Sequence, residues 1–139
     1  MILGLGTDLC DIRRIERSLE RFGERFTARV YTENERQKAA RRPNPAPVFA
    51  QCFAAKEACS KALGTGLRRG VYLRDIEVGN ETSGKPYLRL SGGALQRLRE
   101  ITPPGMSAQI NVSLTDEYPL AHGIVIISAV AGDIEREVP

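Results

Sequence analysis

A glutamate and a lysine, Glu57 and Lys61, stand four residues apart in a segment that is otherwise apolar or small. That spacing is about one turn of an α-helix, so both side chains project from the same face. A charged pair on a buried helix costs desolvation free energy unless each charge has a partner. A divalent cation would satisfy Glu57 and a phosphate would satisfy Lys61. The alternative interpretation is an ordinary Glu–Lys pair that stabilises the helix.

A second carboxylate, Asp8, ends the apolar run MILGLGTD at the start of the chain. This run predicts a buried strand, in which Gly4 and Gly6 allow another backbone to approach closely. Asp8 is therefore expected at the carboxyl end of a strand, where ligands commonly bind. Asp11 is better placed to cap the helix that follows. Asp8 and Glu57 together offer two hard oxygen ligands, an arrangement that Mg²⁺ commonly uses with substrate phosphates.

The element after the first strand is predicted to be one amphipathic helix over residues 11–29. Apolar residues at three- and four-residue steps form its core face, and arginines at similar steps form a basic stripe roughly 125° away. Most such stripes are solvated faces, although a basic surface also attracts acidic partners. The core face comprises Ile12, Ile15, Leu19, Phe22 and Phe26, and the stripe comprises Arg14, Arg17, Arg21 and Arg25.

Further along, Thr32 and Glu35 form a capping box for a short helix, which a proline-rich connector at residues 41–47 ends. The long helix carrying Glu57 and Lys61 is expected from about residue 48 to 63. The fold class is α+β, with helices packed on one face of a largely antiparallel sheet. The other predicted elements are strands at 73–78, 86–90, 107–115 and 123–131, a helix at 91–101 and a frayed tail at about 132–139.

The composition favours one domain spanning residues 1–139. No apolar run approaches the ~20 residues of a membrane-spanning helix, and the first residues lack the features of a secretory signal. Cys10, Cys52 and Cys59 lie in or beside apolar segments. They predict reduced, buried thiols in a cytoplasmic protein.

The arginines, concentrated in the first 42 residues, leave open a small basic nucleic-acid-binding module. An aromatic content of only 6% provides no base-stacking surface. Asp8 and Glu57 would also repel a phosphate backbone unless a metal were present. We therefore expect neither a nucleic-acid nor a membrane partner.

The two site segments together resemble one known family. The pattern Gly6-x-Asp8, followed by Ile12, Arg14 and Ile15, and the run FAAKEACSKALGTG from Phe53 to Gly66 resemble the holo-acyl-carrier-protein synthases. These are the small bacterial 4′-phosphopantetheinyl transferases. The resemblance extends from Met1 to about Ala131 and includes Gly84-Lys85-Pro86.

The resemblance implies Mg²⁺-dependent transfer of the phosphopantetheine arm from coenzyme A to a serine of apo-acyl-carrier protein, with release of adenosine 3′,5′-bisphosphate. It also implies a trimer with active sites in clefts between subunits. Asp8 and Glu57 match the metal-ligand positions, and Lys61 matches the position that contacts the pyrophosphate. The general base stays open between Glu57 and a metal-bound water, and an inactive carrier-binding homologue remains an alternative.

The resemblance also assigns residues to the two substrates. Coenzyme A would meet Gly64, Thr65 and Gly66, with Lys85 and Pro86 near its adenine end. Acyl-carrier proteins are acidic, and the implied docking contacts are Arg14, Arg21, Arg25, Phe26 and Arg29. Whether the carrier serves fatty-acid or polyketide synthesis, and whether acylated coenzyme A is accepted, is not decided by these residues.

Two departures from the family pattern affect the site. Cys52 stands where many relatives carry Arg, so a phosphate contact is either lost or supplied by another residue such as Arg68. Many relatives also carry a histidine in the late segment that here reads Val112 to Glu117. The only histidine, His122, lies beyond that segment and is expected to be structural.

Overall fold

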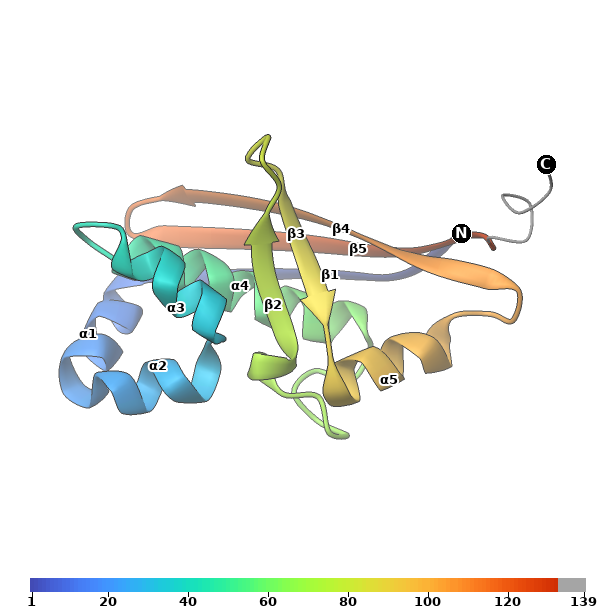
Figure 1. Ribbon diagram of the computed structural model, residues 1–139, viewed down its shortest axis with the longest axis horizontal. Coiled ribbons are helices and arrows are strands. Elements are labelled where there is room, and N and C mark those ends of the chain that lie inside the picture. The colour runs from blue at the N-terminus through green and yellow to red at the C-terminus, as the bar shows by residue number, and fades with distance from the viewer. Residues whose placement is uncertain (133–139) are drawn as a thin grey trace.

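The main sheet has three antiparallel strands in the order β1–β5–β4. The structure, a computed structural model (Figure 1), describes residues 1–132, so the predicted tail lies almost entirely outside the described residues. Alternate residues of β5, from Ala121 to Ala129, are buried, because one face of the sheet packs against helices. The strands are β1 (Ile2–Asp11), β4 (Met106–Glu117) and β5 (Leu120–Ala131).

The long helix α4 (Ala46–Ala62) packs against β1 and β5 on that buried face. Glycines make this packing close, as predicted. A Cβ atom at Gly4 or Gly6 would lie 1.8 Å from a backbone oxygen of Ala62 or Ala58 respectively. In Figure 1 the helices all lie on the same side of the main sheet, which confirms the predicted α+β architecture.

The single helix predicted for residues 11–29 is wrong. Gly23, with φ 53°, separates α1 (Ile12–Phe22) from α2 (Glu24–Val30). The break turns the chain, so Phe22 is 41% exposed instead of lying in the core. Asp11 caps α1 as predicted, accepting a hydrogen bond from the Arg13 backbone N–H.

A two-stranded hairpin crosses the helical layer. Its strands are β2 (Ile76–Asn80) and β3 (Pro86–Leu90), followed by α5 (Gly92–Ile101). The start of the predicted strand at 73–78 is wrong, because residues Leu73–Asp75 form a 3-10 turn. The predicted capping box of Thr32 and Glu35 is confirmed and begins α3 (Glu33–Ala40).

Two boundaries differ from expectation in ways that affect the site. Strand β1 continues to Asp11, so Asp8 lies within the strand, paired with Gly123, and not at its end. The predicted connection at residues 116–122 is mostly strand, because β4 and β5 run up to a tight turn at Tyr118 and Pro119. Both strand ends were predicted too short, because polar residues at these exposed ends still pair with the neighbouring strand.

The core lies around α4, and it contains all three cysteines as buried free thiols, as predicted. Burial raises the pKa of Cys10 to about 11, and those of Cys52 and Cys59 to about 12. These thiols are therefore neutral and part of the packing.

A membrane-spanning helix would have to be long and apolar, and residues 1–132 contain no such helix.

Candidate active site

Lys61, in the last turn of α4, reaches across to β1. Its Nζ lies 3.0 Å from Asp8 Oδ1 and donates a second hydrogen bond, also 3.0 Å long, to the Thr7 carbonyl oxygen. The close packing of β1 on α4 makes this contact possible, since Asp8 lies on the strand face that the helix covers. Among residues 1–132, no ion pair joins Glu57 to Lys61, so the alternative of a simple Glu–Lys helix pair is not supported.

Glu57 lies one turn before Lys61 on α4 and is half-buried. The pKa of its carboxyl is raised above the usual value, first by burial and then by the negative charge of Asp8, while Lys61 and Arg14 act in the opposite direction. Asp8 and Glu57 thus form a region with two negative charges close together, beside the positive charges of Lys61 and Arg14. Such a region attracts a cation.

The residues present fit a magnesium ion that also binds substrate phosphate. Mg²⁺ typically takes one or two protein carboxylates and completes its shell with water and phosphate oxygens. Asp8 and Glu57 supply these two carboxylates. Within residues 1–132, no group of three or more His, Cys, Asp or Glu side chains could hold a metal by itself. The donor set therefore suits a metal held jointly with a ligand and not a closed structural site.

The loop after α4 turns sharply back beside Lys61. Gly64 and Gly66 have φ values of 80° and 59°, a region that favours glycine. Their backbone N–H groups donate to the carbonyls of Lys61 and Ser60. The Thr65 hydroxyl donates to the Gly66 carbonyl oxygen within the loop. The predicted coenzyme-contacting residues of this loop therefore directly adjoin the Asp8–Glu57–Lys61 cluster.

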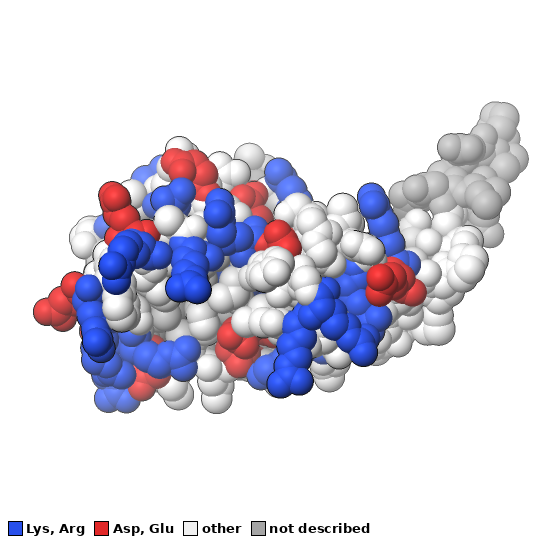
Figure 2. All heavy atoms as spheres, turned by 90° about the horizontal axis from the view of Figure 1, so that it is seen from below, with Lys and Arg blue, Asp and Glu red and all other residues white. Residues whose placement is uncertain are grey.

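The predicted carrier-docking residues form a basic surface over α1 and α2. Figure 2 shows Lys and Arg side chains gathered at the end of the molecule where these two helices lie. The guanidinium groups of Arg21 and Arg25 lie 5.1 and 5.8 Å from the ring centre of Phe22. Phe22, Arg25, Phe26 and Arg29 line a shallow hollow of about 260 Å³. Phe22 is an exposed aromatic residue that the helical periodicity wrongly assigned to the core.

Arg14 links this surface to the acidic cluster. Its guanidinium lies 5.5 Å from the ring centre of Phe53 on α4. Its positive charge also lowers the pKa of Glu57, opposing the effect of burial. The basic surface therefore extends from α2 to the edge of the site around Glu57.

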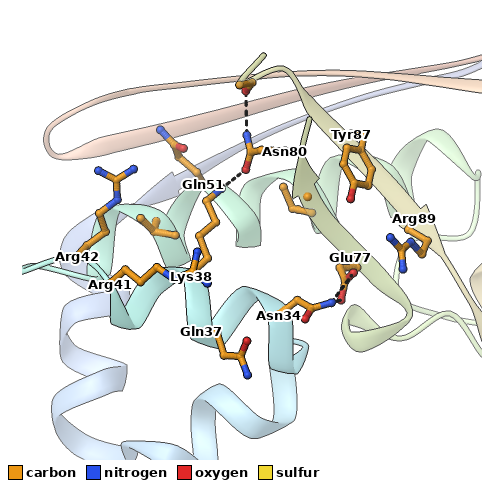
Figure 3. Close-up of a pocket in the computed structure, with 14 residues that line it drawn as sticks. Asn34, Gln37, Lys38, Arg41, Arg42, Gln51, Glu77, Asn80, Tyr87 and Arg89 are labelled. Carbon is orange, nitrogen blue, oxygen red and sulfur yellow. Dashed lines mark hydrogen bonds between the residues drawn. The ribbon is translucent and has the colours of Figure 1, made fainter. Parts of the chain in front are cut away.

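A larger cavity of about 850 Å³ lies between α3, α4 and the β2–β3 hairpin (Figure 3). Lys38, Arg41, Arg42 and Arg89 give its lining a positive charge, and Tyr87 contributes an aromatic ring. Sequence reasoning did not identify this cavity, because its lining comes from three separate segments.

The hairpin residues predicted to contact coenzyme A lie apart from the acidic cluster. Lys85 is exposed beside the turn of the hairpin, and Pro86 begins β3. Among the hydrogen bonds and ion pairs of residues 1–132, none joins these two residues to Asp8, Glu57 or Lys61. Within one chain, the predicted coenzyme residues thus form two separate groups.

The positions that depart from the family pattern have structural roles. The Cys52 side chain is 2% exposed and lies in the core. The ring of His122 makes a 2.6 Å hydrogen bond with the Thr7 hydroxyl, on the sheet face opposite α4. This places His122 away from Asp8, in agreement with the expectation that it is structural.

Sequence reasoning missed one buried ion pair close to the site. Lys56 Nζ lies 2.7 Å from Glu35 Oε1, and both side chains are fully buried. The available signal was a charged residue, Lys56, on the buried side of an alanine-rich helix. Its partner was hidden because Glu35 also serves in the capping box of α3.

The fold and the site together define a small α+β protein in which two carboxylates and a lysine lie together between β1 and α4. The family model of the "4′-phosphopantetheinyl transferase superfamily" matches residues 4–121. The chain belongs to this superfamily and is a transferase. The match covers Asp8, the whole of α4 and the hairpin.

Individual relatives agree with this assignment. The chain is 63% identical, over 94% of its length and 96% of the relative, to a holo-acyl-carrier-protein synthase of Methylorubrum populi. Its fold matches the crystal structure of holo-acyl-carrier-protein synthase from Neisseria meningitidis with a TM-score of 0.81 and 34% identity, over 92% of this chain and 99% of that one. It also matches the Helicobacter pylori enzyme in complex with coenzyme A, with a TM-score of 0.76 and 26% identity over 89% and 99% of the two chains.

Proposed function

We propose that this transferase moves the 4′-phosphopantetheine arm of coenzyme A to a serine of apo-acyl-carrier protein and releases adenosine 3′,5′-bisphosphate. The observation that carries the proposal is the cluster of Asp8, Glu57 and Lys61, brought together by the packing of β1 on α4. Relatives named as holo-acyl-carrier-protein synthases, one of them 63% identical, support the same reaction.

Each residue of the cluster has a task that the reaction requires. Attack of a hydroxyl on a phosphorus atom of a pyrophosphate needs positioning and neutralisation of negative charge. Lys61 carries an ammonium that can leave Asp8 for the leaving phosphate, because its side chain is 50% exposed. The serine proton would pass either to the Glu57 carboxylate or to a metal-bound water.

Magnesium is the proposed cofactor, held by Asp8 and Glu57. When bound, the ion would neutralise charge on the phosphates and polarise them. The Gly64–Thr65–Gly66 loop next to Lys61 would lie against the coenzyme, and its exposed flanking arginines, Arg68 and Arg69, would bind the coenzyme phosphates.

The partner proposed for the basic surface is an acidic acyl-carrier protein. Arg14, Arg21, Arg25 and Arg29 would pair with its carboxylates, while Phe22 and Phe26 provide apolar contacts in the hollow between them. Each exposed ion pair contributes only about 0.2–1 kcal/mol. Their combined field matters more for the association rate and its sensitivity to salt. Arg14 would place the docked carrier next to Glu57.

A homotrimer is the proposed assembly, with the whole chain acting as one catalytic domain. The sheet face opposite α4 exposes Ile2, Leu5 and Leu9, which are 69%, 60% and 64% accessible. A row of large apolar residues on an uncovered sheet is typical of an interface. Assembly between subunits would also explain why Lys85 and Pro86 lie apart from Asp8 in a single chain.

The test is mass spectrometry of an apo-acyl-carrier protein incubated with this protein, coenzyme A and Mg²⁺. We expect the carrier to gain one phosphopantetheine, and we expect no gain when EDTA replaces Mg²⁺. Absence of a gain with several carriers and a folded protein would instead favour an inactive carrier-binding homologue. Tight, sequence-dependent binding to DNA or RNA at about 150 mM salt would favour a nucleic-acid-binding module.

A further inference from the structure

The buried pair of Lys56 and Glu35 contacts more than one element of the fold. Lys56 Nζ donates to the carbonyl oxygens of Leu73 and Ile76, at 2.9 and 2.5 Å, in addition to its 2.7 Å contact with Glu35. The second carboxylate oxygen of Glu35 accepts a 2.8 Å hydrogen bond from the Val78 backbone N–H. The pair therefore joins α3, α4 and β2, with both side chains fully buried.

The ion pair forms the hydrogen bonds to β2 that a neighbouring strand would otherwise form. Strand β2 pairs with β3 on one edge only, so its other edge is free within the two-stranded sheet. In a strand, the carbonyl of one residue and the N–H two residues later point to the same edge. Ile76 offers the carbonyl and Val78 the N–H, and the ion pair supplies one donor and one acceptor to match them.

Neighbouring polar contacts continue along the same edge. The Asn34 amide donates to the Glu77 carboxylate, and Lys38 donates to the side-chain oxygen of Asn80, as the dashed lines in Figure 3 show. These contacts are exposed and surround the cavity between α3, α4 and the hairpin. The buried ion pair is thus the interior part of a row that holds α3 along β2.

We propose that Lys56 and Glu35 are positioning residues that replace a third strand on β2 and thereby fix the hairpin relative to the turn of α4 that carries Glu57. Lys56 directly precedes Glu57 in the chain, and the hairpin carries Lys85 and Pro86. The pair therefore sets the position of the hairpin's coenzyme-binding residues, an inference that rests on the proposed function for its catalytic consequence.

The test compares wild type with a double variant, Glu35→Leu with Lys56→Met. Removing one partner alone would leave a buried unpaired charge, whereas replacing both with apolar residues of similar size commonly preserves the fold. The matched control is Glu33→Gln, which breaks the surface pair with Arg36 on the same helix and does not touch β2. Thermal unfolding verifies that each variant is folded.

Two readouts separate positioning from simple packing. We expect amide hydrogen exchange in the segment covering residues 73–90 to become at least about tenfold faster in the double variant, because Val78 loses its acceptor. We expect the KM for coenzyme A to rise at least about fivefold with kcat changed less than twofold, because substrate placement and not chemistry is impaired. The Glu33→Gln control should match wild type in both.

Unchanged hydrogen exchange in the hairpin of a folded double variant would overturn the proposal, as would faster exchange with an unchanged KM. If the double variant does not fold, the near-isosteric variant Glu35→Gln provides the second comparison. The glutamine amide has one acceptor oxygen where the carboxylate has two, so it cannot accept from both the Lys56 ammonium and the Val78 N–H, and hairpin exchange should still be faster than in wild type. Hydrogen exchange needs no substrate, so a failure of the proposed reaction would appear separately, as an inactive wild type.

Discussion

At the scale of single residues, the proposed metal site depends on Asp8, whose carboxylate already has a partner. In the structure Lys61 is its partner, at 3.0 Å, while Glu57 has no ion-pair partner among residues 1–132. A cation that binds both carboxylates would compete with the Lys61 ammonium for the negative charge of Asp8, and we infer that it displaces this ammonium. The displaced Lys61 would then be free to contact a phosphate, so one contact couples metal binding to substrate binding.

This competition predicts that Lys61→Gln tightens metal binding. An exposed ion pair is worth about 0.2–1 kcal/mol, so we expect Mn²⁺ to bind roughly twofold to fivefold more tightly without coenzyme A. Electron paramagnetic resonance titration of free Mn²⁺ measures this directly. Lys85→Gln, which removes a lysine of the exposed hairpin, should bind Mn²⁺ as wild type does. Weaker Mn²⁺ binding by Lys61→Gln would show that Lys61 supports the metal site and does not compete with it.

At the scale of elements, the site depends on how closely β1 approaches α4. Gly4 and Gly6 allow that approach, since any side chain there would overlap the helix backbone. The turn of α4 bearing Lys61 is in this way kept within hydrogen-bonding distance of Thr7 and Asp8. The glycines are therefore part of the construction of the site, although neither one touches a ligand.

A Gly6→Ala substitution should separate the two elements. Its Cβ would lie 1.8 Å from the Ala58 backbone oxygen, so we expect a loss of about 3 kcal/mol or more in the free energy of unfolding. Urea denaturation measures the change. The control is Gly105→Ala, where no atom lies within 4 Å and the φ of 78° alone is unfavourable, which costs about 1–2 kcal/mol. Equal losses in the two variants would argue against tight packing as the cause.

Some of the strands and helices that form the site could be predicted from the sequence, and others could not. The apolar run with interleaved glycines predicted β1 and its close packing, and the alanine-rich segment predicted α4, so Asp8, Glu57 and Lys61 could be brought together. Helical periodicity could not predict the break at Gly23, because the apolar and basic spacing continues across it. The partner of Lys56 could also not be predicted from the sequence, because it depends on tertiary packing of α3 against β2.

At the scale of the whole molecule, the two faces of the main sheet are unequal. One face is covered by α4, and the other exposes large apolar residues of β1 such as Leu5 and Leu9. Leu5 pairs with Ile126 of β5, so the apolar surface continues across two strands. In the proposed trimer this surface would be buried between copies of the chain.

We expect light scattering after gel filtration to give three times the chain mass of 15.3 kDa. Leu9→Glu should shift the protein toward the monomer, because a buried carboxylate without a partner is costly. Leu67→Glu replaces an exposed apolar residue in the loop after α4 and should leave the mass unchanged. A monomeric wild type at micromolar concentration would contradict the proposed trimer.

The central claim is that the carboxylates of this chain carry the transfer reaction, and the most direct test is the rate of carrier modification by Glu57→Gln in the mass-spectrometric assay. Glu57→Gln preserves side-chain size but removes a negative charge needed for metal binding and for proton acceptance. We expect the rate to fall at least about 100-fold at saturating Mg²⁺, while Glu100→Gln, a change to an exposed carboxylate of α5, stays within twofold of wild type. A Glu57→Gln rate equal to that of wild type at limiting Mg²⁺ would contradict the account.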